Sequence, residues 1–200
     1  MGSKVSMARA DLTIAARFLD VIENDVLALT EVGVAGGNKV FGAAILRKSD
    51  LSLVVAGTNS EVENPLFHGE IATLNAFYKI DTQGRPRTAD CLFLSTHEPC
   101  SLCLSAITWA GFDNFFYLFG YETTRDVFKI PHDLRILSEV FRIENGGYAR
   151  RNAFWTARSI GELAGDDPVL GKRMTAIRAR YDALSAVYQA SKVGSDIPLN

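Results

Sequence analysis

Apolar residues recur along this chain with two different spacings, and each spacing predicts a different kind of element. In residues 7–30 they stand three and four apart with acidic residues between them, which predicts an amphipathic helix. The runs 40–47 and 51–56 are rich in β-branched residues, and Lys48-Ser49-Asp50 between them predicts a hairpin. Further helices are predicted at 69–80, 100–111, 131–137 and 169–191, and further strands at 91–95, 115–119 and 139–143.

Strands that alternate with helices predict an α/β sandwich, and two hundred residues are enough for one such core. We expect a main domain over residues 1–148 and an extension over 149–200 that packs on the same domain. Phe154 and Trp155 at the start of this extension could close a pocket, but aromatic pairs more often serve packing, so we expect them to anchor the final helix. The last nine residues are predicted to be a disordered tail.

The composition limits the expected location of the protein, its partners and the state of its cysteines. No apolar run approaches the length of a bilayer-spanning helix, and no export or organelle address is visible, so we expect a cytoplasmic protein without a membrane partner. A net charge of −2 is not the basic balance of a nucleic-acid-binding protein, so nucleic acid is not the expected partner. Three cysteines give no even-numbered disulfide set, and we expect Cys91 to be a buried core thiol.

Two short motifs carry the chemistry. His68-Gly69-Glu70 opens one predicted helix, and Cys100 and Cys103 stand three apart at the start of another, so both sulfurs lie on one face. The positive end of that helix also favours thiolate over thiol. The motifs supply three zinc ligands and one spare carboxylate, as expected of a catalytic zinc rather than a closed four-ligand structural site. A carboxylate beside zinc-activated water can move its proton.

Two alternatives stay open at this point. A Cys-x-x-Cys pair alone also occurs in redox proteins and in structural zinc sites. His97 lies three residues before Cys100 and could act as a fourth ligand, which would close the site.

His-x-Glu followed by Pro-Cys-x-x-Cys resembles the signature of the zinc-dependent nucleobase and nucleoside deaminases. Residues 40–44, Val-Phe-Gly-Ala-Ala, are similar to a first-strand stretch of guanine deaminases and tRNA adenosine deaminases, and residues 57–59, Gly-Thr-Asn, are similar to the end of their second strand. The resemblance implies a three-layer α/β/α cytidine deaminase-like fold, with a central five-stranded mixed sheet, helices on both faces and a C-terminal helical extension.

The resemblance also implies a role for each matching residue. His68, Cys100 and Cys103 would bind one Zn²⁺ per chain, and Glu70 would be the catalytic proton shuttle. Substrate-binding residues would be Asn59, through a hydrogen bond to the ring, Phe41, as a wall of the pocket, and Gly69, through its backbone amide. Gly69 replaces the alanine usual in the family, which preserves the amide but loosens the helix start.

The implied reaction is hydrolytic deamination of a small aminated heterocycle by attack of zinc-bound hydroxide, with release of ammonia. Ala106-Ile107-Thr108-Trp109 resembles a helix of guanine deaminases, so Trp109 favours a guanine-like base, although packing in a core or subunit interface also explains it. Cytosine and related rings need the same chemistry, and the motif does not choose among bases, nucleosides and nucleotides. The alternatives are a tRNA adenosine deaminase, which the net charge opposes, and a non-catalytic zinc-stabilised binding protein. The resemblance implies a homodimer.

Overall fold

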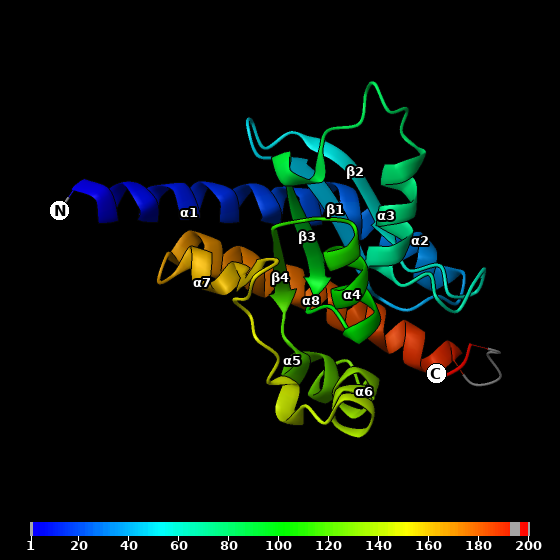
Figure 1. Ribbon diagram of the computed structural model, residues 1–200. Helices are drawn as coiled ribbons and strands as arrows, with labels where there is room; N and C mark the ends of the chain where they lie inside the picture. The colour runs from blue at the N-terminus through cyan, green and yellow to red at the C-terminus, as the bar shows by residue number, and fades with distance from the viewer. Residues whose placement is uncertain (1, 193–196, 200) are drawn as a thin grey trace.

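The computed structural model describes residues 2–192 and 197–199, and it shows one five-stranded sheet between layers of helices (Figure 1). The strands stand in the order β2-β1-β3-β4-β5. β1 runs antiparallel to β2 and β3, whereas β4 runs parallel to β3 and β5. The predicted mixed α/β sheet is therefore confirmed. The strand bounds are β1 Gly42–Arg47, β2 Leu53–Thr58, β3 Cys91–His97, β4 Asn114–Phe119 and β5 Thr156–Ser159.

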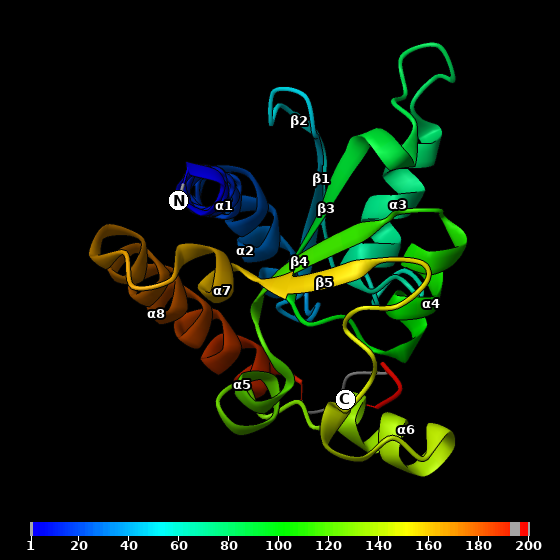
Figure 2. The ribbon, with the colours of Figure 1, turned by 60° about the vertical axis from the view of Figure 1, so that its left-hand side comes forward.

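Helices cover both faces of the sheet, as Figure 2 shows when the sheet is seen nearly edge-on. One face carries α3 (Gly69–Lys79) and α4 (Ser101–Trp109). The other carries α1 (Gly2–Val21), a π-helical segment (Ile22–Val26), α2 (Leu27–Ala35), α7 (Ile160–Ala164) and α8 (Pro168–Ser191). Two further helices, α5 (Tyr121–Asp126) and α6 (His132–Phe141), lie beyond the end of β4.

Strand β3 explains why the sheet is buried on both faces. Its side chains alternate between two apolar clusters, because successive residues of a strand point to opposite sides. Leu92 and Leu94 pack with the layer of α1, α2 and α8. Cys91 and Phe93 pack with the layer of α3 and α4. Cys91 is a fully buried free thiol, as predicted, and the unbroken apolar run is typical of a strand covered on both sides.

The predicted fifth strand at 139–143 is wrong. Residues up to Phe141 belong to α6, which ends at Arg142 in the left-handed conformation, with φ of 60°. Leu134, Leu137 and Phe141 stand three and four apart, and this helical spacing was the stronger signal. The fifth strand is instead β5, only four residues long, and it pairs in parallel with β4 through Asn114 and its neighbours.

Residues 149–200 are therefore more than a helical extension, because they supply the edge strand of the sheet. The division of the chain at residue 148 stays a prediction. The two aromatic residues before β5 differ sharply in environment. Trp155 is buried against Phe115 and donates its ring N–H to Thr108 Oγ1 at 2.8 Å, whereas Phe154 is 68% exposed. Trp155 therefore anchors the segment before β5 to β4 and α4, and neither aromatic residue anchors the final helix, which packs on the other face of the sheet.

Of the predicted disordered tail, residues 193–196 and 200 lie outside the described residues. Within 197–199, Ile197 is buried and the Leu199 carbonyl accepts a hydrogen bond from Lys39 Nζ at 3.2 Å. Among the described residues, no helix has both the length and the apolar character that a membrane crossing needs.

Candidate metal and active site

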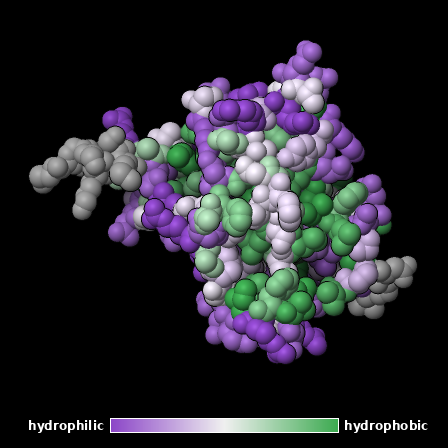
Figure 3. Space-filling view, viewed as in Figure 1, coloured by the Kyte–Doolittle hydropathy of each residue, from purple (hydrophilic) through white to green (hydrophobic). Residues whose placement is uncertain are grey.

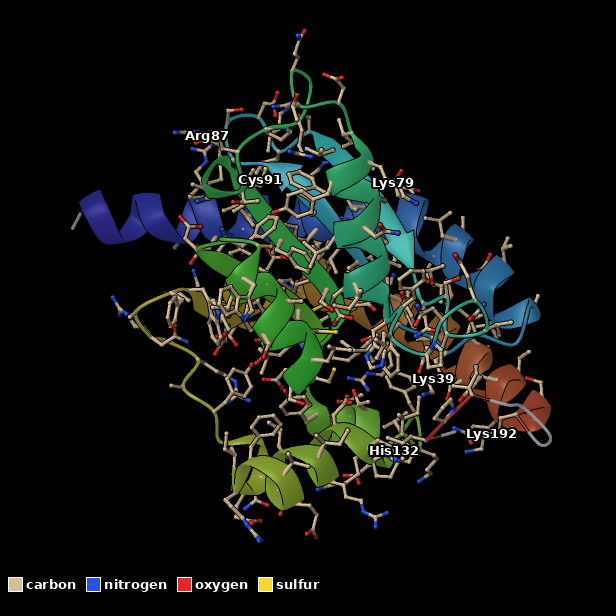
Figure 4. All side chains as sticks on the ribbon, turned by 45° about the vertical axis from the view of Figure 1, so that its right-hand side comes forward. Lys39, Lys79, Arg87, Cys91, His132 and Lys192 are labelled. Atoms are coloured by element: carbon tan, nitrogen blue, oxygen red, sulfur yellow. The ribbon has the colours of Figure 1, made fainter. Side chains whose placement is uncertain are left out.

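Both motifs stand at the N-terminal ends of helices on the same face of the sheet. His68 immediately precedes α3 and Glu70 lies in its first turn, while Cys100 precedes α4 and Cys103 lies in the first turn of that helix. Figure 4 shows Lys39 and His132 at this end of the sheet and Cys91 near the opposite end. The two helix starts therefore bring four chemically active side chains to one place.

Three of these side chains form a compact donor group. His68 Nδ1 lies 3.4 Å from Cys100 Sγ and 3.8 Å from Cys103 Sγ, and the two sulfurs are 3.6 Å apart. Tetrahedral zinc, with Zn–S of about 2.3 Å and Zn–N of about 2.0 Å, places its donor atoms about 3.5–3.8 Å from one another. The spacing and the Cys₂His chemistry of the group therefore fit Zn²⁺. His68, Cys100 and Cys103 are the residues that would hold it.

Glu70 lies beside this group without belonging to it. Its side chain is buried, its Oε1 accepts a hydrogen bond from Ser95 Oγ at 2.9 Å, and its Oε2 accepts one from Cys103 Sγ at 3.3 Å. Burial raises the pKa of the Glu70 carboxyl, and the neighbouring Cys100 thiolate raises it further. A raised pKa moves the carboxyl group toward the pH range in which it can both take up and release a proton, as a proton shuttle must.

Two of the three ligands, His68 and Cys103, carry protons before a metal binds. A hydrogen bond from Cys103 lowers the pKa of the Cys100 thiol well below its usual range, against the effect of burial and with help from His68. Burial lowers the pKa of His68, but the Cys100 thiolate, with Glu61 and Glu70, outweighs it and raises the value to about 9. Burial keeps Cys103 in the thiol form. A metal ion must therefore displace protons from His68 and Cys103.

The donor group borders a cavity of about 350 Å³, which lies in the size range of small-molecule sites. Its walls are mostly apolar, with Phe41 on one side and Leu66, Leu102 and Ile136 on others. A recess of about 10 Å³ shares Phe41, His68 and Cys100 with the cavity and reaches Glu70. A recess of this size accommodates about one water molecule.

No role was expected from the sequence for Lys39 and Glu61, which line the cavity, or for two polar residues at the start of α6. His132 had no expected role beyond the surface, yet it is half-buried and lines the cavity together with Asp133. Loss of solvent, and then the Cys100 thiolate, raise the pKa of Asp133 well above its usual range. The signal that could have found them is Pro131-His132-Asp133, a polar helix start that follows the apolar residues Val127, Phe128 and Ile130.

His97 is not one of the three grouped ligands, although it lines the small recess that borders His68, Cys100 and Glu70. The three-residue metal group found among the described residues does not include it. Its ring is fully buried among Phe41, Phe119, Phe128 and Tyr181, and its Nδ1 lies 2.9 Å from Thr96 Oγ1. Burial lowers the pKa of His97 to about 3, so the ring is neutral. A closed four-ligand site built with His97 therefore has no support in this geometry.

Asn59 and Trp109 lie away from the cavity wall. Asn59 is buried, its Oδ1 accepts from the backbone N–H groups of Lys39 and Glu61, and its Nδ2 donates to Glu61. A hydrogen bond from Asn59 to a substrate ring stays a prediction. Trp109 is 91% exposed at the end of α4 and is not a lining residue of the cavity. Figure 3 shows hydrophobic side chains gathered on the face over α4 and α6.

Gly69 is required by packing rather than by flexibility at the helix start. A Cβ at this position would lie 2.7 Å from the Phe41 carbonyl oxygen and 2.9 Å from Gly42 Cα. Both are backbone atoms, which cannot turn aside as a side chain can. The absence of a side chain at Gly69 therefore lets α3 begin directly against β1, and this contact fixes where His68 and Glu70 lie.

The fold and the donor set define a metal-binding α/β protein with an acid beside three ligands. Residues 22–119 match the family model of the cytidine and deoxycytidylate deaminase zinc-binding region. Zn²⁺ is its metal.

Individual relatives agree with this family. Guanine deaminase of Bacillus subtilis (strain 168) is 32% identical over 85 residues, which are 42% of this chain and 52% of that protein. The matched part of the chain thus spans about half the length of that relative. A mutant of NE0047 in complex with 8-azaguanine is 21% identical, with a TM-score of 0.53 over 85% of this chain and 84% of that one. NE0047 in complex with 2,6-diaminopurine is 22% identical, with a TM-score of 0.52 over 89% and 82%. These two structures show a shared fold.

Gly69→Ala should weaken both the fold and the metal site. The added Cβ must push α3 from β1, and such overpacking typically costs about 1–3 kcal/mol of unfolding free energy. Zinc affinity should fall as well, because His68 moves with the start of α3. Gly171→Ala is the matched control, since a Cβ there meets nothing within 4 Å. Chemical denaturation and zinc titration of both variants measure the effect, and equal behaviour of the two would contradict the packing role of Gly69.

Proposed function

We propose that this protein is a zinc-dependent hydrolytic deaminase of a small aminated base, with a guanine-like purine as the favoured substrate. The observation that carries the proposal is the position of Glu70. It lies 3.3 Å from the metal-binding sulfur of Cys103 and borders a recess the size of one water molecule, at the inner end of a cavity. A purely structural zinc site needs neither the buried acid nor the cavity.

Glu70 would do the proton work of this reaction. Bound Zn²⁺ supplies the Lewis acidity that makes water a nucleophile at neutral pH. Metal binding removes the Cys103 thiol proton, which frees Glu70 Oε2, while Ser95 still holds Oε1. Glu70 would take one proton from the attacking water and give it to a ring nitrogen, and would then move the remaining proton of the added hydroxyl group to the departing amine. One water molecule is consumed, the C–N bond breaks, and ammonia and a carbonyl product result.

The lining of the cavity suits a flat ring whose faces contact apolar side chains and whose edge carries hydrogen-bond donors. Phe41 and the aliphatic side chains offer contact to the faces of a ring, and Asp133 offers a carboxyl oxygen to N–H groups. Guanine carries such donors at its ring nitrogen and its exocyclic amine. The name of the Bacillus subtilis relative and the bases bound to NE0047 point the same way. The preference for a purine rests on these observations rather than on Trp109.

Glu70→Gln should abolish ammonia release and leave zinc bound, because glutamine keeps the shape of the side chain but cannot carry the proton. The test compares ammonia release from guanine, 2,6-diaminopurine, adenine, cytosine, cytidine and deoxycytidylate, with zinc content measured in parallel. Glu63→Gln, an exposed acid in the loop before α3, is the control and should keep full turnover. Undiminished turnover in Glu70→Gln would refute the mechanism, and cytosine as the best substrate would refute the purine preference.

We further propose a cytoplasmic homodimer that uses the exposed face of α4. This helix carries no charged residue, and it leaves Leu102 37% and Trp109 91% exposed, an unusual surface for a monomer. Sedimentation velocity should show a dimer for the unchanged chain and a monomer for Trp109→Lys. Val169→Lys, at another exposed apolar position, should remain dimeric. A monomeric unchanged chain would contradict this arrangement.

A further inference from the structure

A chain of buried polar residues lies behind the metal ligand His68, on the side away from the cysteines. Glu61 Oε1 accepts a hydrogen bond from Lys39 Nζ at 2.9 Å, and Glu61 Oε2 accepts one from Asn59 Nδ2 at 2.6 Å. The side chains of Lys39 and Glu61 are only 7% and 3% exposed. Both carboxylate oxygens of Glu61 are therefore held in place.

The two nitrogens of His68 face opposite partners. Nδ1 points to the two cysteine sulfurs, and Nε2 lies 3.7 Å from Glu61 Oε1. When Nδ1 binds a metal, the proton of the neutral ring must sit on Nε2, which is the nitrogen that faces the carboxylate. At 3.7 Å the contact is electrostatic rather than a hydrogen bond, and it favours this tautomer and this orientation of the ring.

Hydrogen bonds to neighbouring residues hold the Glu61 carboxylate in place independently of His68. Asn59 Oδ1 accepts from the backbone N–H of Glu61 and of Lys39, both at 3.2 Å, so one amide side chain ties the two charged residues together. Lys39 Nζ also donates to the Leu199 carbonyl at 3.2 Å, which adds the C-terminal residues to the same network. Glu61 is thus a rigid acceptor rather than a mobile surface acid.

A buried ion pair is a poor means of merely fastening a loop. Apolar side chains of similar volume often stabilise a protein as well or better, because burying two charges carries a large desolvation penalty. The presence of a buried Lys39–Glu61 pair is explained if the negative charge of Glu61 orients the His68 ring. The lysine then compensates a carboxylate that would otherwise be buried alone.

We infer that Glu61 is a positioning residue for the metal site: it orients His68 with Nε2–H toward its carboxylate and Nδ1 toward Zn²⁺, while Lys39 and Asn59 hold it. Glu61 does not touch the metal. Glu61 holds the His68 ring in its metal-binding orientation, so that the ring loses less orientational freedom when the ion binds. The inference depends on the metal site and holds whichever base is the substrate.

Zinc affinity of Glu61→Gln, measured by competition with a chromophoric chelator, tests the inference. The dissociation constant should rise about 10–100-fold, as is typical when an outer partner of a ligating histidine is removed. Glu63→Gln, which changes an exposed acid of the same loop, should bind zinc within about twofold of the unchanged chain. Because no substrate is involved, a failure here is distinct from a failure of the proposed deaminase activity.

A second variant separates positioning from simple destabilisation. Glu61→Gln leaves the Lys39 charge buried without its partner and should lower the melting temperature of the metal-free chain. The double variant Lys39→Met/Glu61→Gln removes both charges, and its metal-free melting temperature should recover while its zinc affinity stays weak. Recovery of zinc affinity in the double variant, or zinc binding by Glu61→Gln as tight as in the unchanged chain, would overturn the role of Glu61.

Discussion

The close contact between the start of α3 and the end of the loop that enters β1 is the constraint on which the site depends. Gly69 lies so near Phe41 and Gly42 that no side chain fits between them. This contact sets the first turn of α3 beside β1 and β3, and β3 leads directly into α4. His68 and Glu70 therefore meet Cys100 and Cys103 at one point, although thirty or more residues separate the two motifs. The close packing of the Gly69 backbone thus brings the two motifs together, which the spacing of the ligands within each motif does not do.

The electrostatic environment of these four side chains favours the binding of a cation. Burial holds Cys103 as a thiol and raises the pKa of Glu70, while the Cys100 thiolate keeps His68 protonated. Removal of protons from His68 and Cys103 by a divalent ion leaves Glu70 as the nearby group free to move a proton. Glu61 lies on the other side of His68 and fixes the ring from behind. The acid that would act in chemistry and the acid that would position the ligand are thus two different glutamates on opposite sides of the metal group.

Local patterns in the sequence were enough for most elements and for the ligand group. The apolar spacing predicted four of the five strands, and the motif spacing predicted three donors with a spare acid. Long-range pairing was not predictable in the same way. β5 is four residues long and is a strand only because β4 offers it an edge, so the run 139–143 was mistaken for it. His132 and Asp133 line the cavity because α6 packs beside it. Lys39, which precedes β1, forms an ion pair with Glu61, which follows β2. Such contacts follow from tertiary structure, which no local spacing encodes.

The central claim is that three protein ligands hold the metal and leave one position open beside Glu70. X-ray absorption spectroscopy of the zinc-loaded chain measures this coordination directly. We expect two sulfur neighbours at about 2.3 Å, one imidazole nitrogen at about 2.0 Å and one light atom from solvent. A second imidazole, which would point to His97, or a third sulfur would show a closed site and contradict the three-ligand arrangement.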